Sequence, residues 1–182
     1  LFSKQMKILV FGKSGQLGNQ FYREFGKNKN YIFLNRNDAD FTNLEALKKI
    51  IYKINPNIII NTAAFTQVDL AEDKKNIAMT VNAKALDVIS SSAKELSIYL
   101  IHYSTDYVFD GTSKIPYVEN DKTNPINYYG KTKLSGEDYI IQSGCNFTIF
   151  RTSWVISSSG NNFVKKIIEL AKTKENLDVI ND

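Results

Sequence analysis

A tyrosine and a lysine stand four residues apart in a stretch whose pattern predicts a helix. Tyr129 and Lys133 lie in the sequence YGKTK, and a spacing of four places two side chains on one helix face. A free phenol has a pKa of about 10 and exchanges protons poorly at neutral pH. A nearby ammonium favours the phenolate and lowers that pKa. The pair therefore predicts a general acid, although this short pattern also arises by chance on helix surfaces.

Two hydroxyl side chains, Ser104 and Thr105, follow an apolar run at residues 98–103. A hydroxyl in this place can hydrogen-bond a substrate carbonyl and polarise it. We expect Thr105 to take this role with Ser104 assisting, and the alternative is that both only satisfy backbone groups after a strand. His102, the one histidine, is expected to be a packed residue and neither a catalyst nor a metal ligand. No cluster in the sequence has the spacing of a metal site.

Three glycines, Gly12, Gly15 and Gly18, lie between an apolar run at residues 7–11 and a predicted helix at residues 16–25. Without side chains the backbone can turn tightly and approach a pyrophosphate, which the N-terminus of the helix attracts. Alone this pattern also fits an ordinary glycine turn. Directly after the first strand of an alternating fold, it favours a dinucleotide site, and its G-x-x-G-x-x-G spacing suits the short-chain dehydrogenase/reductase superfamily.

The end of the second predicted strand bears on which dinucleotide would bind. An acidic residue there usually holds the 2′-hydroxyl of NAD, but this sequence has Asn35 and Arg36. Arg36 could pair with the 2′-phosphate of NADP, or it could be a surface arginine. Asp40 and Phe41 follow, either near the adenine or as a loop aspartate and a core phenylalanine. We expect NADPH or NADH, with a slight preference for NADPH.

Apolar runs alternate with amphipathic stretches along the whole chain. The pattern predicts strands at residues 7–11, 31–34, 57–61, 98–103, 147–151 and 177–180, and helices at residues 16–25, 44–54, 77–96, 128–142 and 163–172. Buried strands separated by helices predict an α/β fold, a Rossmann-like doubly wound parallel sheet with helices on both faces. In such sheets ligands bind beyond the carboxyl ends of the strands, and each group described above directly follows a strand or opens a helix.

Length and composition fit one globular domain. The 182 residues carry 23 Lys plus Arg and 19 Asp plus Glu, a net charge of +4, and scattered lysine pairs predict solvated helix faces in place of a nucleic-acid surface. No apolar run approaches the ~20 residues that span a bilayer. One cysteine, Cys145, cannot form an internal disulfide, which favours the cytoplasm. We expect residues 1–5 to be a tag or linker remnant and residues 6–182 to be the nucleotide-binding domain.

Five segments together resemble the dTDP-4-dehydrorhamnose reductases, which are extended short-chain dehydrogenase/reductases. The segments are VFGKSGQLG at residues 10–18, NTAAFTQVDLAE at 61–72, HYSTDYVFDG at 102–111, NYYGKTKLSGE at 127–137 and FRTSWV at 150–155. The resemblance implies NAD(P)H-dependent reduction of the C4 keto group of dTDP-4-dehydro-L-rhamnose. It also implies that a smaller C-terminal substrate region is missing from this chain, and it allows a homodimer as the assembly.

The resemblance also implies the roles of individual residues. It places Thr105, Tyr129 and Lys133 at the catalytic positions, and Ser104, Thr105 and Trp154 at substrate contacts; Trp154 could otherwise be a core residue. The implied cofactor contacts, together with Arg36 and the catalytic pair, are Gly12, Ser14, Gly15, Gln16, Leu17, Gly18, Asp40, Phe41, Ala63, Ala64 and Thr66.

Two other functions remain open at this point. The first is a related nucleotide-sugar dehydratase or epimerase. Dehydratases of the superfamily usually have a T-D-E sequence, whereas Tyr107 stands at the third position here. The second is a non-catalytic, cofactor-binding role like that of the regulatory subunit of methionine adenosyltransferase, against which the complete set of Thr105, Tyr129 and Lys133 argues.

Overall fold

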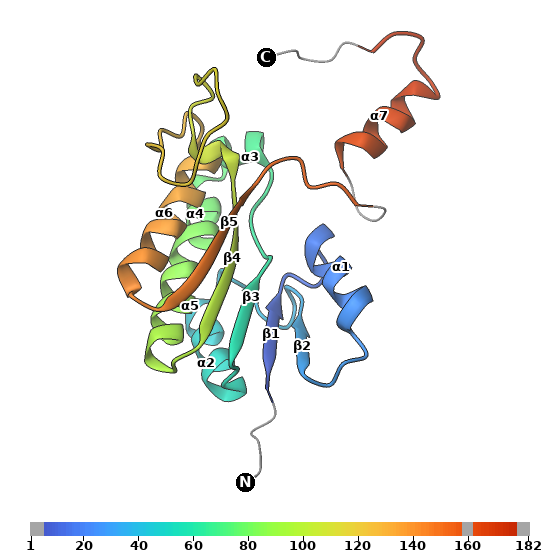
Figure 1. The fold of residues 1–182 in the computed structure, drawn as a ribbon. Coiled ribbons are helices and arrows are strands. Elements are labelled where there is room, and N and C mark those ends of the chain that lie inside the picture. The colour runs from blue at the N-terminus through green and yellow to red at the C-terminus, as the bar shows by residue number, and fades with distance from the viewer. Residues whose placement is uncertain (1–5, 158–161, 178–182) are drawn as a thin grey trace.

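A parallel five-stranded sheet forms the centre of the molecule (Figure 1). The computed structural model describes residues 6–157 and 162–177. The strand order is β2-β1-β3-β4-β5, and the strands are β1 (Ile8–Phe11), β2 (Tyr31–Leu34), β3 (Ile58–Asn61), β4 (Tyr99–Thr105) and β5 (Asn146–Thr152). The winding direction reverses at β1, which makes the edge beyond β1 and β3 the expected ligand site. The predicted α/β class and the Rossmann-like parallel sheet are confirmed.

The middle strands are apolar on both sides because both faces of the sheet are covered. All four residues of β1 are buried. Leu9 and Phe11 pack on one face with the larger core, whereas Ile8 and Val10 pack on the other face with Ile60 of β3. This two-sided burial explains why the strand sequences are continuous apolar runs instead of alternating ones.

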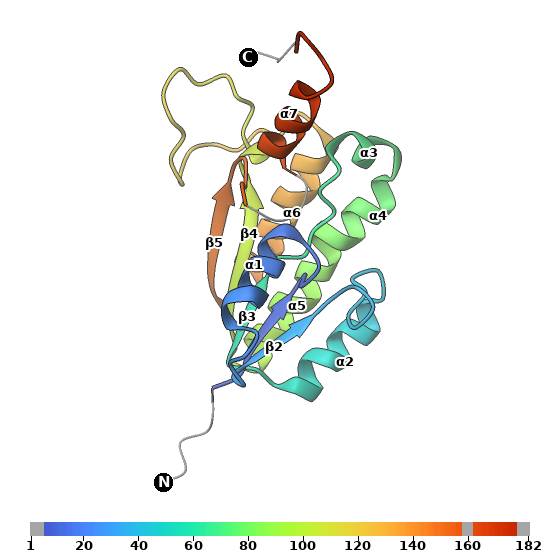
Figure 2. The ribbon, with the colours of Figure 1, turned by 90° about the vertical axis from the view of Figure 1, so that its right-hand side faces the viewer.

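Most helices cover one face of the sheet. These are α2 (Leu44–Ile54), α4 (Lys75–Met79), α5 (Ala85–Glu95) and α6 (Tyr128–Ser143), and Figures 1 and 2 show them together on that side. Asn127 caps α6 by accepting a hydrogen bond from the Gly130 N–H, and Gly144 ends it with φ +64°. The caps fix where α6 begins, and therefore where its first-turn side chains lie.

The opposite face is covered by α1 (Gln16–Phe25). Phe21 of α1 packs against the smaller apolar cluster, and α7 (Phe163–Ala171) lies beyond the carboxyl end of the sheet (Figure 2). The predicted helices at residues 16–25 and 44–54 match α1 and α2 to the residue. Within the described ranges, none of the helices has the length and hydropathy needed to cross a membrane.

The predicted single helix at residues 77–96 is wrong in its detail. It begins at Lys75 and is interrupted by a π-helical segment, η1 (Thr80–Lys84), while α3 (Val68–Asp73) precedes it unpredicted. The apolar periodicity continues through η1, so hydropathy alone does not reveal the extra backbone residue of a π turn. The predicted strand at residues 177–180 falls almost wholly outside the described residues.

Candidate active site

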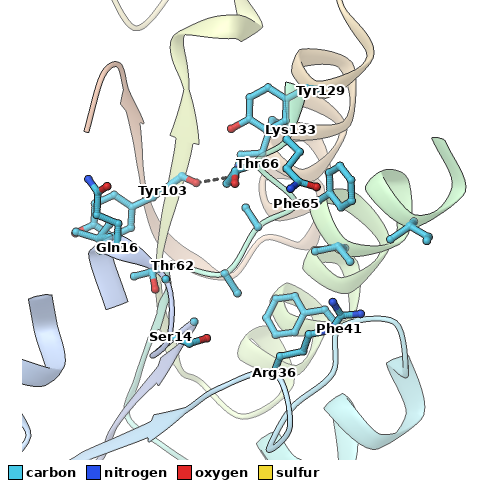
Figure 3. A pocket seen from close by; sticks show the side chains of 18 of the residues that line it. Ser14, Gln16, Arg36, Phe41, Thr62, Phe65, Thr66, Tyr103, Tyr129 and Lys133 are labelled. Carbon is cyan, nitrogen blue, oxygen red and sulfur yellow. Dashed lines mark hydrogen bonds between the residues drawn. The ribbon is translucent and has the colours of Figure 1, made fainter. Parts of the chain in front are cut away.

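A cavity of about 870 Å³ opens beyond the carboxyl ends of β1, β3 and β4 (Figure 3). Its walls come from the loops after β1, β2 and β3, from the end of β4 and from α6. Fourteen of the predicted site residues line it: Gly12, Ser14, Gly15, Gln16, Leu17, Arg36, Asp40, Phe41, Ala63, Ala64, Thr66, Ser104, Tyr129 and Lys133. The topology therefore brings together segments that are more than 100 residues apart in sequence.

The glycine loop lies at one end of this cavity and is packed too closely to admit side chains. Gly12 has φ +88°, and a Cβ there would stand 2.6 Å from Thr62 Oγ1. A Cβ on Gly18 would stand 2.1 Å from the Gly12 carbonyl oxygen, so α1 begins in direct backbone contact with β1. Gly15 caps α1 without a side-chain hydrogen bond. The first N–H groups of α1 are thus left for an anionic group.

The loop after β2 forms another wall. Arg36 Nε lies 3.9 Å from Asp40 Oδ2 and its side chain is exposed. The Thr42 N–H, more than Arg36, lowers the pKa of Asp40, so this carboxylate stabilises a turn. Phe41 is buried and packs edge-on against Phe11 while also lining the cavity. Phe41 is therefore a core residue, as one of the two alternatives has it, and it also forms part of the cavity wall.

Tyr129 lies at the other end of the cavity and is only 9% exposed. Burial raises the pKa of Tyr129, and a hydrogen bond with the Thr105 side chain opposes this effect. The ring of Tyr107 packs edge-on against Tyr129. The expected lowering of the pKa of Tyr129 is therefore wrong. Burial outweighs the effects that lower this pKa, and Lys133 contacts Tyr103 and His102 instead.

Lys133 is fully buried beneath the cavity. Its Nζ donates a hydrogen bond to the Tyr103 carbonyl oxygen at 2.7 Å, marked in Figure 3, and lies 3.1 Å from Nε2 of His102. Burial lowers the pKa of Lys133 to about 8. His102 is a packed residue, as expected, but it also contacts this lysine, a role that the sequence did not indicate.

Ser104 and Thr105 are the last residues of β4, which extends two residues beyond the predicted end of this strand. The Thr105 hydroxyl donates to Asp106 Oδ1 at 3.0 Å and accepts from the Tyr107 N–H, so it stabilises the following turn as well as contacting Tyr129. Ser104 lines the cavity, is buried, and its Oγ has no hydrogen-bond partner among the described residues. A buried hydroxyl in that state is suited to a ligand atom.

Three predicted site residues, Gly18, Thr105 and Trp154, do not line the cavity. Trp154 is 68% exposed, with φ +47°, and packs edge-on against Phe163. The alternative that it is a core residue is therefore wrong. Its neighbour Val155 does line the cavity, and its carbonyl accepts a hydrogen bond from Gln16 Nε2 at 2.6 Å. The segment after β5 is thus tied to the glycine loop.

Asn82 is a structural residue of the site that the sequence analysis missed. It is buried in η1, and its amide accepts from the Phe65 N–H at 2.8 Å and donates to the Phe65 carbonyl and to Thr132 Oγ1, both at 3.0 Å. A Cβ at Gly136 would lie 2.2 Å from the Asn82 carbonyl oxygen. Asn82 therefore joins the cavity wall at Phe65 to the helix that contains Tyr129 and Lys133.

Replacing Asn82 by alanine is expected to lower the free energy of unfolding by about 1–3 kcal/mol, because buried partners on Phe65 and Thr132 lose their hydrogen bonds. Denaturant unfolding measures this change. Asn76→Ala is the matched control, since Asn76 is exposed in α4, six residues earlier, and such a change is expected to stay within about 0.5 kcal/mol. Equal effects of the two substitutions would contradict the role given to Asn82.

Comparison with known proteins shows the family to which the chain belongs. The family model described as "RmlD substrate binding domain" matches residues 6–182. A dTDP-4-dehydrorhamnose reductase of Shigella flexneri is 44% identical over 181 residues, which are 97% of this chain and 60% of the relative. The chain thus spans about three fifths of the length of the curated relatives it matches.

Solved structures give the same result. A dTDP-4-dehydrorhamnose reductase of Clostridium acetobutylicum superposes with a TM-score of 0.89 at 40% identity, covering 94% of this chain and 61% of that one. The enzyme of Bacillus anthracis in complex with NADP superposes with a TM-score of 0.89 at 34% identity, covering 94% and 62%. The resemblance seen in the sequence is confirmed, and the chain belongs to the family of the RmlD substrate binding domain.

Proposed function

We propose that this chain is the nucleotide-binding part of an NAD(P)H-dependent reductase that converts dTDP-4-dehydro-L-rhamnose to dTDP-L-rhamnose. The observation that carries the proposal is one cavity with an anion-binding glycine loop at one end and Tyr129, Lys133 and Ser104 at the other. The names of the relatives, which are dTDP-4-dehydrorhamnose reductases, support the substrate. The whole activity belongs to the longer protein that these relatives represent.

The cavity fits a dinucleotide on the chain's own geometry. The absence of Cβ atoms at Gly12 and Gly18 lets the start of α1 pack directly against the end of β1 and the loop after β3, and the uncapped start of α1 offers N–H groups to a pyrophosphate. The volume of about 870 Å³ suits a ligand of this size. The complex of the Bacillus anthracis relative with NADP supports the same class of cofactor. Reduced nicotinamide, when bound, supplies the hydride.

The residues at the far end would handle the proton and the carbonyl. Tyr129 donates its phenolic proton to the substrate oxygen as the carbonyl becomes an alcohol. The Thr105 hydroxyl is engaged with Asp106, Tyr107 and Tyr129, so we give it the role of holding the phenol. The carbonyl-polarising role expected of Thr105 goes to Ser104, whose unpartnered Oγ donates the hydrogen bond. Trp154, exposed beyond β5, offers an aromatic surface to the substrate. We propose the other predicted contacts, from Ser14 to Thr66, as cofactor contacts on the basis of their place in the cavity wall.

The test is turnover by the full-length protein. Supplied with dTDP-4-dehydro-L-rhamnose and NADPH or NADH, it is expected to consume reduced nicotinamide only when the sugar is present. Product analysis separates a reductase from a dehydratase or epimerase, because those reactions regenerate the cofactor. Tight cofactor binding without turnover on any nucleotide sugar would instead favour the binding-subunit function.

Arg36 is expected to determine the preference for NADPH. Its guanidinium is exposed at the cavity edge, and a charge-assisted hydrogen bond to a 2′-phosphate contributes about 1.5–3 kcal/mol. Arg36→Ala should therefore weaken NADPH binding about tenfold or more and leave NADH binding unchanged, as measured by calorimetry. Arg23→Ala, an exposed arginine of α1 outside the cavity lining, serves as the control. An equal loss for both cofactors would refute this role.

A further inference from the structure

The one histidine of the sequence is buried between two strands and the helix that contains the catalytic pair. His102 of β4 is fully buried and lies beside Asn61 of β3, with which it is in register. Its Nδ1 lies 3.1 Å from Asn61 Nδ2, and its Nε2 lies 3.1 Å from Lys133 Nζ. The proposed function gives no role to either His102 or Asn61.

The orientation of the Asn61 amide follows from its other hydrogen bond. Asn61 Oδ1 accepts from the Ala63 N–H at 3.0 Å, so Nδ2 is the group that faces His102. Turning the amide over would set its NH₂ group against the Ala63 N–H. Because Nδ2 can only donate, His102 Nδ1 must accept, and the proton of the neutral ring resides on Nε2.

This tautomer has a consequence for Lys133. The Nε2–H of His102 points at Lys133 Nζ, and it can donate only to a nitrogen that has a lone pair. An ammonium group has three donors and no acceptor, whereas the uncharged amine has one lone pair. The amine can accept from His102 and still donate to the Tyr103 carbonyl. Every hydrogen bond in this chain of groups is therefore satisfied only when Lys133 is uncharged.

The surrounding charges agree with this picture. Burial lowers the pKa of Lys133 to about 8 against a smaller opposing effect of Glu137, one helical turn further along α6. Arg151 of β5 pairs with Glu137 at 2.7 Å and offsets its charge. Burial, and then Lys133, lowers the pKa of His102, so the ring stays neutral. Further along the site, the titratable groups that act on Tyr129 are Tyr107 and Asp106.

We propose that Asn61 and His102 are positioning residues that favour the uncharged amine of Lys133 over its ammonium, so that the tyrosine–lysine pair can gain and lose a proton instead of holding a permanent cation. The catalytic meaning of this arrangement rests on the proposed function. The arrangement itself does not, because it is a property of the folded chain.

Because His102 is the sole histidine, ¹⁵N-histidine labelling of the chain gives ring signals from this residue alone. At pH 10 the spectrum is expected to show a neutral ring protonated on Nε2. As the pH falls through the Lys133 pKa of about 8, the signals should shift, because the ammonium can no longer accept from Nε2–H. In Lys133→Met this step should vanish. A ring protonated on Nδ1 at pH 10, or a step that persists in Lys133→Met, would overturn the proposal.

Asn61→Asp is expected to reverse the tautomer of His102, because it replaces the NH₂ group that faces Nδ1 with an oxygen atom. The carboxylate can accept from both the Ala63 N–H and a protonated Nδ1, which frees Nε2 to accept from the Lys133 ammonium. The ring is expected to switch to the Nδ1–H tautomer, and the Lys133 step to move to higher pH. An unchanged tautomer would contradict the role of Asn61, and a variant that fails to fold leaves the wild-type and Lys133→Met spectra as the deciding test.

The same variant connects the arrangement to catalysis. In the full-length reductase, the pH dependence of kcat that reflects Lys133 should move to higher pH in Asn61→Asp by the same amount as the spectral step. If the tautomers are as proposed and no turnover is found, the proposed function fails alone. If turnover is found and the wild-type ring is protonated on Nδ1, the positioning role fails alone.

Discussion

Tyr129→Phe is expected to reduce turnover of dTDP-4-dehydro-L-rhamnose by the full-length protein about 10²–10⁴-fold, which is the usual contribution of a positioned general acid. The variant keeps the aromatic ring that packs against Tyr107 and removes only the phenolic oxygen. The fold and the glycine loop are therefore unaffected, and binding of reduced cofactor should change little. Loss of kcat with retained cofactor affinity is the result that identifies Tyr129 as the proton donor.

Tyr128→Phe is the matched control. Tyr128 precedes Tyr129 on α6, but it packs beside Phe65 and Val68 around the Ala71 cluster and lies outside the cavity lining. Its variant should turn over at nearly the wild-type rate. If Tyr128→Phe lost activity and Tyr129→Phe kept it, the geometry of the site would be wrong; if neither lost activity, the acid would have to be another group.

The sequence predicted the sheet well because of a simple physical signal. The central strands are buried on both faces, so they are short apolar runs between polar turns, as in the four buried residues of β1. The starts of two helices were predicted correctly from apolar spacing, and the structure shows that each is capped. Asn43 and Asn127 each accept an N–H of the first turn, and the helices that follow begin where the sequence analysis placed them.

What the sequence could not reveal depends on contacts between distant segments. The π turn at Asn82 exists because its amide binds Phe65 and Thr132, neither of which is a neighbour in sequence. The buried contact of His102 with Lys133 joins β4 to α6. The raised pKa of Tyr129 depends on burial, which spacing along one helix does not encode. Spacing thus placed Tyr129 and Lys133 together as a candidate pair, but it did not predict the direction of the tyrosine pKa shift.

Gly18→Ala is expected to disrupt the nucleotide end of the site. The new Cβ would stand 2.1 Å from the Gly12 carbonyl oxygen and 2.6 Å from its carbon, and both are backbone atoms of the loop that Gly12 begins. Relief requires α1 to move away from β1. Such overpacking usually costs about 1–3 kcal/mol of stability, and the moved helix start would no longer present its N–H groups to a pyrophosphate. Denaturant unfolding and calorimetric titration with NADPH measure the two losses.

Gly15→Ala is the control, because it tests whether the losses come from the steric clash at position 18 or from replacing any glycine of the loop. Gly15 has φ −76°, a conformation open to alanine, and its Cβ would stand 3.3 Å from the Gly12 carbonyl oxygen, a contact that a shift of a few tenths of an ångström relieves. Its stability should fall less than that of Gly18→Ala. Equal losses would mean that the loop needs flexibility at every glycine. A larger loss for Gly18→Ala would show that direct contact between the start of α1 and the end of β1 is what shapes the nucleotide site.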